Sequence, residues 1–307
     1  QPVIINCDED TSKIINTSNK TFLLNNYPVF EVKIRETNAQ NTNTNEELYV
    51  PLPFHIAEKL FANDTLSSYI SENNHDFLTE TGAVKSLSYN ASFLRPHLVS
   101  NCYYDVLMGS QGAETPFKYE LNYRNFFMVT QGSIKVKLAP PKSSRYLYPV
   151  NDYENLEFRS SINPWSPQAK YKIDFDKIKC LELSLEPGRI LYIPAYWWYS
   201  FQYDKTQPTS VSCLKYRTYM NNLAISPNIF MYALQNQNVE RKIAKKTDIK
   251  NLQTSDQIPN NETPIDQLPT PIITNVEQVT PISELVNTDN SIPDILIPKE
   301  EEVPLYM

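Results

Sequence analysis

The sequence predicts a mainly β protein, a β-sandwich or barrel with flanking helices, followed by a C-terminal helix and an extended tail. Eight short apolar or alternating runs, separated by turn residues, lie between Cys102 and Cys213, a pattern typical of sandwiches and barrels. All five glycines fall between Gly82 and Gly188, which places the turn-rich folded core there. Residues 251–307 contain eight prolines and no glycine, so an extended, semi-rigid strand is expected there.

The composition excludes several classes of function. With 307 residues, of which 41% are hydrophobic, the chain can bury a sizeable core. The net charge is −7 and no basic stripe is present, so no nucleic-acid partner is expected. No apolar run approaches the roughly 18 to 20 residues that cross a bilayer, so no membrane span is expected in this chain. Four scattered cysteines without a CxxC pair disfavour a metal site and indicate buried free thiols in a reducing compartment.

Residues 1–89 are expected to form strands and a helix that pack on the β core. The runs interpreted as strands are residues 3–5, 22–24 and 29–34. The Asn- and Thr-rich stretch 38–47 has no means of burying itself, so it is expected to be an exposed loop. A helix from Pro53 to Tyr69 is predicted from the spacing of Ile56, Leu60, Phe61 and Leu66.

Residues 90–225 are assigned to the β core. Its predicted strands are 103–108, 117–122, 126–129, 134–139, 180–185, 190–193, 197–203 and 210–216. Residues 142–172 form a long aromatic and polar insertion between them. We expect this insertion to pack over one mouth of the sandwich or barrel.

A helix over residues 227–246 is predicted next, within a segment 226–247. Ser226 suits the N-cap and Pro227 the first helical position, and basic residues near the end suit a helix C-terminus. The segment 248–307 is an acidic, Pro-rich tail, in which residues 251–307 hold ten acidic residues and one basic residue. Extended arms bind partners through backbone pairing and scattered apolar anchors. The candidate anchors are Ile272, Ile273, Leu285, Ile295, Leu296, Ile297, Leu305 and Tyr306.

Two motifs resemble the JmjC-type oxygenases, and most of all their asparaginyl-hydroxylase branch. Residues 186–203 read EPGRILYIPAYWWYSFQY, where the family has PGD, an IP-x-x-WW run and a closing histidine. Residues 105–141 read DVLMGSQGAETPFKYELNYRNFFMVTQGSIKVKLAPP, similar to the family's T-P-x-H-x-D motif with its following Asn, Gly and Pro-Pro. The resemblance covers roughly residues 90–216. It implies a double-stranded β-helix, or jelly roll, which in that family holds Fe(II) and 2-oxoglutarate.

The residues at the family's metal positions do not suit Fe(II). Aligned from Thr115, the His and Asp positions hold Lys118 and Glu120, and the closing histidine is Tyr199. Aligned from Asn125 instead, the first two positions hold Tyr119 and Leu121, because one extra residue separates the motifs. Neither alignment yields a histidine. A protonated lysine cannot bind a metal, and Lys118 and Glu120 share one face of a strand, so we expect them to form an ion pair beside Tyr199.

The cosubstrate positions have also changed. Ile134 stands where the resembling enzymes have the lysine that pairs with 2-oxoglutarate, and the alternation of residues 134–138 predicts that its side chain points inward. Thr115 is retained as a possible cosubstrate contact, although a structural role is the simpler interpretation.

We therefore expect a JmjC/cupin-like structural protein without catalytic activity or cofactor, whose C-terminal tail binds other structural subunits. Its Gly-poor composition, altered site and long arm suggest a minor capsid protein of a large DNA virus, located in the virion or in a reducing intracellular compartment. A homodimer through helix 227–246 is suggested by the resembling hydroxylases. One alternative is a divergent Fe(II)/2-oxoglutarate-dependent hydroxylase that uses Glu120. The other is a carbohydrate- or small-ligand-binding cupin, for which an open, polar barrel mouth would be the distinguishing observation.

Overall fold

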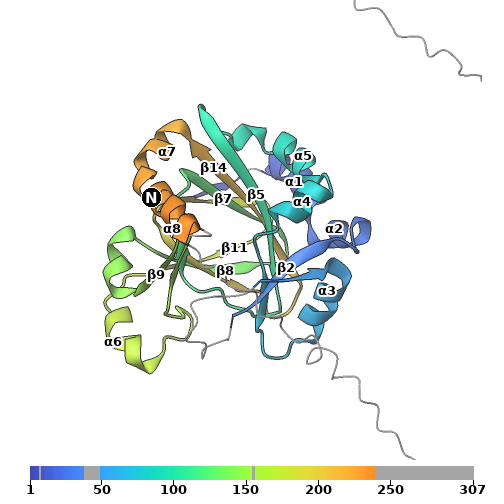
Figure 1. Ribbon diagram of the computed structural model, residues 1–307. Helices are drawn as coiled ribbons and strands as arrows, with labels where there is room; N and C mark the ends of the chain where they lie inside the picture. Colours follow the sequence, from blue (N-terminus) through green and yellow to red (C-terminus); the bar gives the residue numbers. More distant parts are fainter. Residues whose placement is uncertain (7, 38–48, 154–155, 239–307) are drawn as a thin grey trace, which may run out of the picture. The chain divides into compact units, whose positions relative to one another are not determined.

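The computed structural model describes residues 1–6, 8–37, 49–153 and 156–238, within the unit Gln1–Ile243. It confirms a mostly antiparallel β protein with flanking helices, consistent with a jelly roll (Figure 1). The expected loop at 38–47, the tail anchors and residues 239–246 of the expected helix lie outside the described residues.

An eight-stranded antiparallel sheet forms the larger layer. Its strand order is β1-β12-β7-β14-β5-β4-β2-β3. The strands are β1 (Val3–Asn6), β2 (Glu31–Glu36), β3 (Val50–Pro53), β4 (Tyr69–Ser71), β5 (Val99–Gly109), β7 (Arg124–Gln131), β12 (Arg189–Pro194) and β14 (Thr209–Thr218). The N-terminal segment therefore extends the central strands at both edges of this sheet.

A six-stranded sheet faces it, with the order β11-β8-β13-β6-β10-β9. Its strands are β6 (Lys118–Tyr119), β8 (Ile134–Ala139), β9 (Pro149–Asp152), β10 (Glu157–Ser160), β11 (Leu181–Leu185) and β13 (Trp198–Tyr203). All eight predicted core strands are present in the two sheets. Gly132 turns the chain between β7 and β8 at a φ of 74°, where an added Cβ would lie 2.5 Å from Thr209 Oγ1, so only glycine fits.

The interior of the barrel is an apolar cluster made by alternate residues of both sheets. Phe127 of β7 and Phe201 of β13 are fully buried there, with ring centroids 5.1 Å apart. Phe126 and Met128, the neighbours of Phe127, belong instead to the cluster under the helices. Side chains of a strand point alternately to its two faces, so each central strand of the large sheet is buried on both sides.

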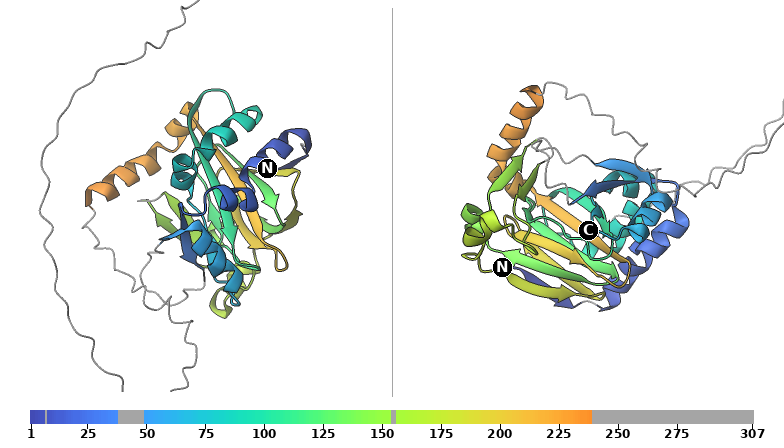
Figure 2. Two further views of the ribbon diagram at one scale, coloured as in Figure 1. Left: turned by 90° about the vertical axis from the view of Figure 1, so that its right-hand side faces the viewer. Right: turned by 90° about the horizontal axis from the view of Figure 1, so that it is seen from below.

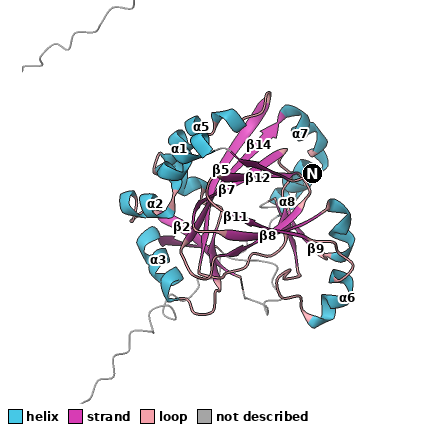
Figure 3. Ribbon diagram, turned by 180° about the vertical axis from the view of Figure 1, so that it is seen from behind, coloured by secondary structure: helices cyan, strands magenta, loops and turns pink. Residues whose placement is uncertain are grey.

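Five helices cover the outer face of the large sheet (Figures 1 and 3). They are α1 (Asp8–Ser18), α2 (Lys20–Asn26), α3 (Phe54–Asn63), α4 (His75–Glu80) and α5 (Ala83–Asn90), and a 3₁₀ turn follows at Ser92–Leu94. Each helix buries at least one apolar side chain against the sheet. The helix layer buries the outer face of these strands, and the alternate side chains of the same strands point into the barrel.

The insertion packs on the small sheet, and it contains 3₁₀ turns at Pro141–Tyr146 and Ala169–Tyr171, β9, β10 and α6 (Lys172–Phe175). After β14 come α7 (Tyr219–Ala224) and α8 (Ser226–Asn238), and α8 projects away from the sheets (Figure 2). The predicted start of this helix is confirmed. Among the described helices, none combines the length and hydrophobicity needed to cross a membrane.

In the N-terminal segment one predicted strand was wrong, and one predicted helix is present but shorter than expected. Residues 22–24 lie in α2, because the Asn19 side chain caps a helix by accepting a hydrogen bond from the Phe22 amide. The helix after residue 53 ends at Asn63, because the Asp64 carboxylate accepts hydrogen bonds from the amides of Leu66 and Ser68 and forms a turn.

The buried face of α3 also differs from the predicted one. Phe54, Ala57 and Phe61 are buried, whereas Ile56 is 44% and Leu66 77% exposed.

We expect Phe61→Ala to lower the free energy of unfolding by about 3–5 kcal/mol, since it empties a packed site. Leu66→Ala, the matched control, should change it by less than about 0.5 kcal/mol. Urea denaturation measures both, and similar losses in the two variants would contradict this packing.

Candidate functional site

The three predicted metal positions lie together inside the barrel. β6 and β13 are neighbours, and Lys118 is paired in register with Tyr199. The Tyr199 hydroxyl donates a hydrogen bond to Glu120 Oε1 at 2.9 Å, and the Lys118 ammonium lies 5.7 Å from the centroid of the Tyr199 ring. The alignment that starts from Thr115 therefore selects three residues, Lys118, Glu120 and Tyr199, that lie side by side in the structure.

The second alignment does not. Tyr119 stacks on Phe158 at 4.9 Å and meets Trp198 edge-on at 4.7 Å, in the layer between the small sheet and the insertion. Leu121 is buried with Phe158 in a separate cluster. Both side chains thus pack away from Tyr199, and Lys118 and Glu120 are the residues that occupy the His and Asp positions.

The expected ion pair between Lys118 and Glu120 is not the one formed. Glu120 pairs with Lys215 of β14, whose Nζ lies 2.7 Å from Oε1, and Lys118 pairs with Glu72, the residue after β4. The prediction considered only neighbours in the motif. Glu72 and Lys215 are 46 and 95 residues away from their partners in sequence, and only the sheet order brings them into contact.

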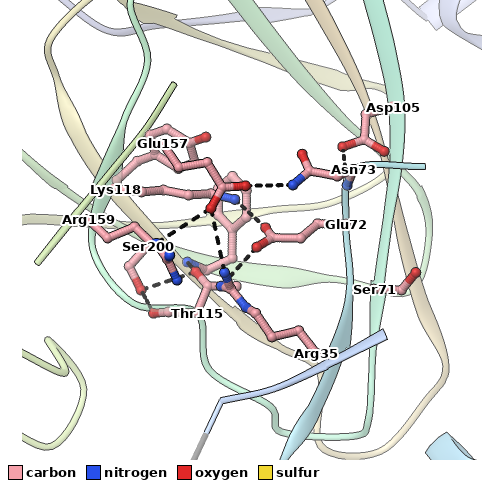
Figure 4. Close-up of polar contacts among 12 residues, drawn as sticks. Arg35, Ser71, Glu72, Asn73, Asp105, Thr115, Lys118, Glu157, Arg159 and Ser200 are labelled. Atoms are coloured by element: carbon pink, nitrogen blue, oxygen red, sulfur yellow. Dashed lines mark hydrogen bonds and ion pairs between the residues drawn. The ribbon is translucent and has the colours of Figure 1, made fainter. Parts of the chain in front are cut away.

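Lys118 and Glu72 belong to a wider network of charged and polar side chains (Figure 4). Arg35 of β2 lies 2.8 Å from Glu72, and their side chains are only 1% and 5% exposed. The Tyr49 hydroxyl donates to Glu72 at 2.9 Å, and the Asn73 side chain donates to Glu157 of β10 at 2.6 Å. Buried charges are tolerated when they are paired and hydrogen-bonded, as here.

The network fixes the protonation states at the centre. Burial alone would raise the pKa of Glu120, but the ammonium groups of Lys215 and Lys118 and the hydrogen bonds from Lys215 and Tyr199 hold it below its usual value. Burial, then the charge of Glu120, raises the pKa of Tyr199 well above normal, so its phenol stays a neutral donor. Burial also raises the pKa of Asp105 to about 6, although Lys215 and the amides of Asn74 and Asn73 oppose this.

These residues do not fit Fe(II). In the described part of the chain no group of three or more His, Cys, Asp or Glu residues is placed to hold a metal ion. The Glu120 carboxylate is already engaged by an ammonium group and a phenol, and Lys118 brings a second positive charge close by. A facial site for Fe(II) needs two neutral imidazoles and a carboxylate with open positions, which this set lacks.

The cosubstrate positions have structural roles. Ile134 is 1% exposed and belongs to the apolar cluster inside the barrel, so its predicted inward orientation is confirmed. Thr115 is buried, and its hydroxyl accepts a hydrogen bond from the Phe201 amide at 2.8 Å. The Ser200 hydroxyl donates to the Thr115 carbonyl at 2.5 Å, so Thr115 ties β13 to the preceding loop.

A polar cavity of about 460 Å³ lies beside the network. Five cationic side chains reach its wall: Lys33, Lys118, Arg159, Lys215 and Arg217. Three acidic ones do so as well, Asp105, Glu120 and Glu157. Residues 156–159 of the insertion form part of the cavity wall.

Sequence reasoning missed Arg35, Glu72, Asp105, Lys215 and Arg217. A signal was present for the last two, because Lys215 and Arg217 alternate with the buried Leu214 and Tyr216 and are the two charged residues of the strand. Charged residues at alternate positions of a central strand indicate a polar barrel interior. No comparable local signal marks Arg35 or Glu72.

The chain matches the Cupin-like domain family over residues 13–230. HSPB1-associated protein 1 of Rattus norvegicus is 32% identical over 106 residues, which are 34% of this chain and 22% of that protein, and the Homo sapiens protein gives the same identity over 21% of its length. The JmjC domain-containing protein D of Dictyostelium discoideum is 32% identical over 93 residues, 30% of this chain and 20% of that protein. The chain thus spans about a fifth of the length of these relatives.

Removing Lys215 should leave a largely buried carboxylate without its cation. We expect Lys215→Met to lower the free energy of unfolding by about 3–5 kcal/mol, and a second change, Glu120→Gln, to restore part of it. Lys177→Met is the matched control, because its pair with Asp174 is solvent-exposed and its loss should change the free energy of unfolding far less. Urea denaturation of the four proteins tests this. A Lys215→Met variant as stable as the control would show that the pair does not hold the interior together.

Proposed function

The chain belongs to the cupin-like domain family, and we propose that it is a non-catalytic member that acts by binding other proteins. One observation carries the proposal. Glu120 is the only typical metal ligand left at the three positions, and its carboxylate already binds Lys215 and Tyr199. We call this position closed, because no free ligand remains there. A metal ion would have to displace a buried ammonium group and would meet a second one at Lys118. Both would raise the free energy of the metal-bound state.

The test is metal and cosubstrate binding by the purified protein. We expect no binding of Mn(II), used as a redox-stable substitute for Fe(II), and no turnover of 2-oxoglutarate with Fe(II) and ascorbate. Isothermal titration calorimetry and succinate release measure the two. The divergent-hydroxylase alternative predicts the opposite: stoichiometric metal, and 2-oxoglutarate turnover that Glu120→Ala abolishes while the distant control Glu182→Ala leaves it intact.

An apolar surface on the last two described helices supports an association role. Large apolar side chains on α7 and α8 are 37% to 70% exposed: Tyr219, Met220, Leu223, Ile229, Phe230, Met231, Tyr232 and Leu234. Contiguous exposed apolar surface commonly marks a protein interface. We propose that a second copy of the chain covers these helices, as the sequence analysis suggested for this segment. The name of the rat and human relatives describes association of those proteins with HSPB1.

The finer assignment to a minor capsid or virion protein stays a prediction from the sequence. It depends on the acidic, Pro-rich tail as the arm that binds partner subunits, and the anchors from Ile272 to Tyr306 lie outside the described residues. The proposed localisation in a virion has the same basis, and that in a reducing compartment depends on the scattered cysteines.

The proposed dimer can be broken at its centre. Phe230 is 62% exposed, and we expect Phe230→Asp to convert a dimer to a monomer, because a charge placed in an apolar interface must be desolvated. Ile173→Asp is the control, since Ile173 is 77% exposed on α6 and should leave the oligomeric state unchanged. Light scattering coupled to size-exclusion chromatography measures the mass. A wild-type monomer at concentrations near 100 μM would contradict the proposal.

A further inference from the structure

The polar cavity remains open although the metal position beside it is closed. The residues of the apolar interior cluster, Ile134 among them, do not form part of its wall, whereas polar residues of β5 and β14 do. These two strands pair in register, Tyr103 with Lys215 and Asn101 with Arg217. The four side chains lie at alternate positions of their strands and all reach the cavity wall.

Nearly every charge on this wall is satisfied within the protein. Lys118 pairs with Glu72, Lys215 with Glu120, Arg159 with Glu157, and Lys33 with Asp76. Among the described residues Asp105 has no salt-bridge partner, but three backbone amides, those of residues 73, 74 and 106, donate to its carboxylate at 2.7 to 2.9 Å. The acidic side chains of the wall therefore have little remaining capacity to bind a cation.

Arg217 is the exception. Its Nε donates to Asn122 Oδ1 at 3.2 Å, and within the part of the chain that the structure describes its two Nη groups have no hydrogen-bond acceptor and no acidic partner within salt-bridge distance. Burial lowers the pKa of its guanidinium only from an already very high value, which leaves it charged. Asn122 holds the guanidinium in place, and the amide of Asn101 lies on the paired position of β5. The groups left free to bind a ligand at this point of the wall are therefore mostly hydrogen-bond donors, and they surround the positive charge of Arg217.

We propose that this cavity binds a small organic anion, whose carboxylate or phosphate group is held by Arg217. The planar guanidinium matches both oxyanions in two-point geometry. A volume of about 460 Å³ is within the range of ligand pockets, and Tyr103, Leu156 and Phe158 offer an aromatic and apolar wall for the rest of the molecule. This function goes beyond protein association and requires neither a metal ion nor a second copy of the chain.

Isothermal titration calorimetry with three probes of one shape tests the proposal. The probes are benzoate, phenyl phosphate and neutral benzamide. We expect at least one anion to bind with a dissociation constant of about 1 mM or tighter, and benzamide to bind at least about 10-fold more weakly. Benzoate alone would identify a carboxylate ligand, and phenyl phosphate alone a phosphate ester. Failure of both anions, or equal binding of benzamide, would overturn the proposal.

Variants then locate the site. Arg217→Gln should weaken anion binding about 10-fold or more, and Arg217→Lys less, because lysine keeps the charge but loses the two-point geometry. Arg189→Gln removes the same charge from an exposed position on β12 and should bind as the wild type does. Equal affinity of Arg217→Gln and wild type would overturn the assignment to Arg217.

An NMR titration of the wild-type protein tests the same site without depending on whether a variant folds. In NMR spectra, anion addition should shift the side-chain amide signals of Asn101 and Asn122. Shifts confined to residues outside the cavity would contradict the site. Metal binding and oligomeric state are measured separately, so failure of this proposal and failure of the proposed function can be told apart.

Discussion

The largely buried ion pair between Glu120 and Lys215, whose side chains are 16% and 11% exposed, is the interaction on which the rest of the interior depends. The carboxylate follows β6 and the ammonium group comes from β14 on the facing sheet, so the pair joins the two layers of the barrel. Tyr199 completes the carboxylate's hydrogen bonds from the adjacent strand β13. Because an unpaired buried charge is costly, these three side chains must be present together. The same pair stands at the position where a metal ion would need open coordination sites.

Closure of this position divides the barrel into two parts with different properties. On one side, Phe127, Ile134 and Phe201 fill the interior with apolar side chains. On the other side, a polar cavity stays open under the insertion, with Arg217 as its least satisfied charge. The open, polar mouth is the observation that favours small-ligand binding over a fully plugged barrel. A non-catalytic scaffold and an anion-binding cavity are therefore compatible in one domain.

The core strands could be predicted from the sequence because alternation and turn residues are local signals. The run 134–139 became β8 as expected, and Ile134 points inward because its neighbours alternate apolar and charged side chains. The two helices before β2 were missed, since their short apolar runs carry no clear period and the Asn19 cap is decisive only once the chain is folded. The partners of Lys118 and Glu120 depend on strand order, which no local pattern encodes.

Anomalous diffraction from crystals grown with Mn(II) tests the central claim most directly. The account predicts no anomalous peak among Lys118, Glu120 and Tyr199, with Lys215 Nζ still within hydrogen-bond distance of Glu120, near the 2.7 Å seen here. A manganese peak bonded to the Glu120 carboxylate, with Lys215 displaced from it, would contradict the account and favour a divergent metalloenzyme.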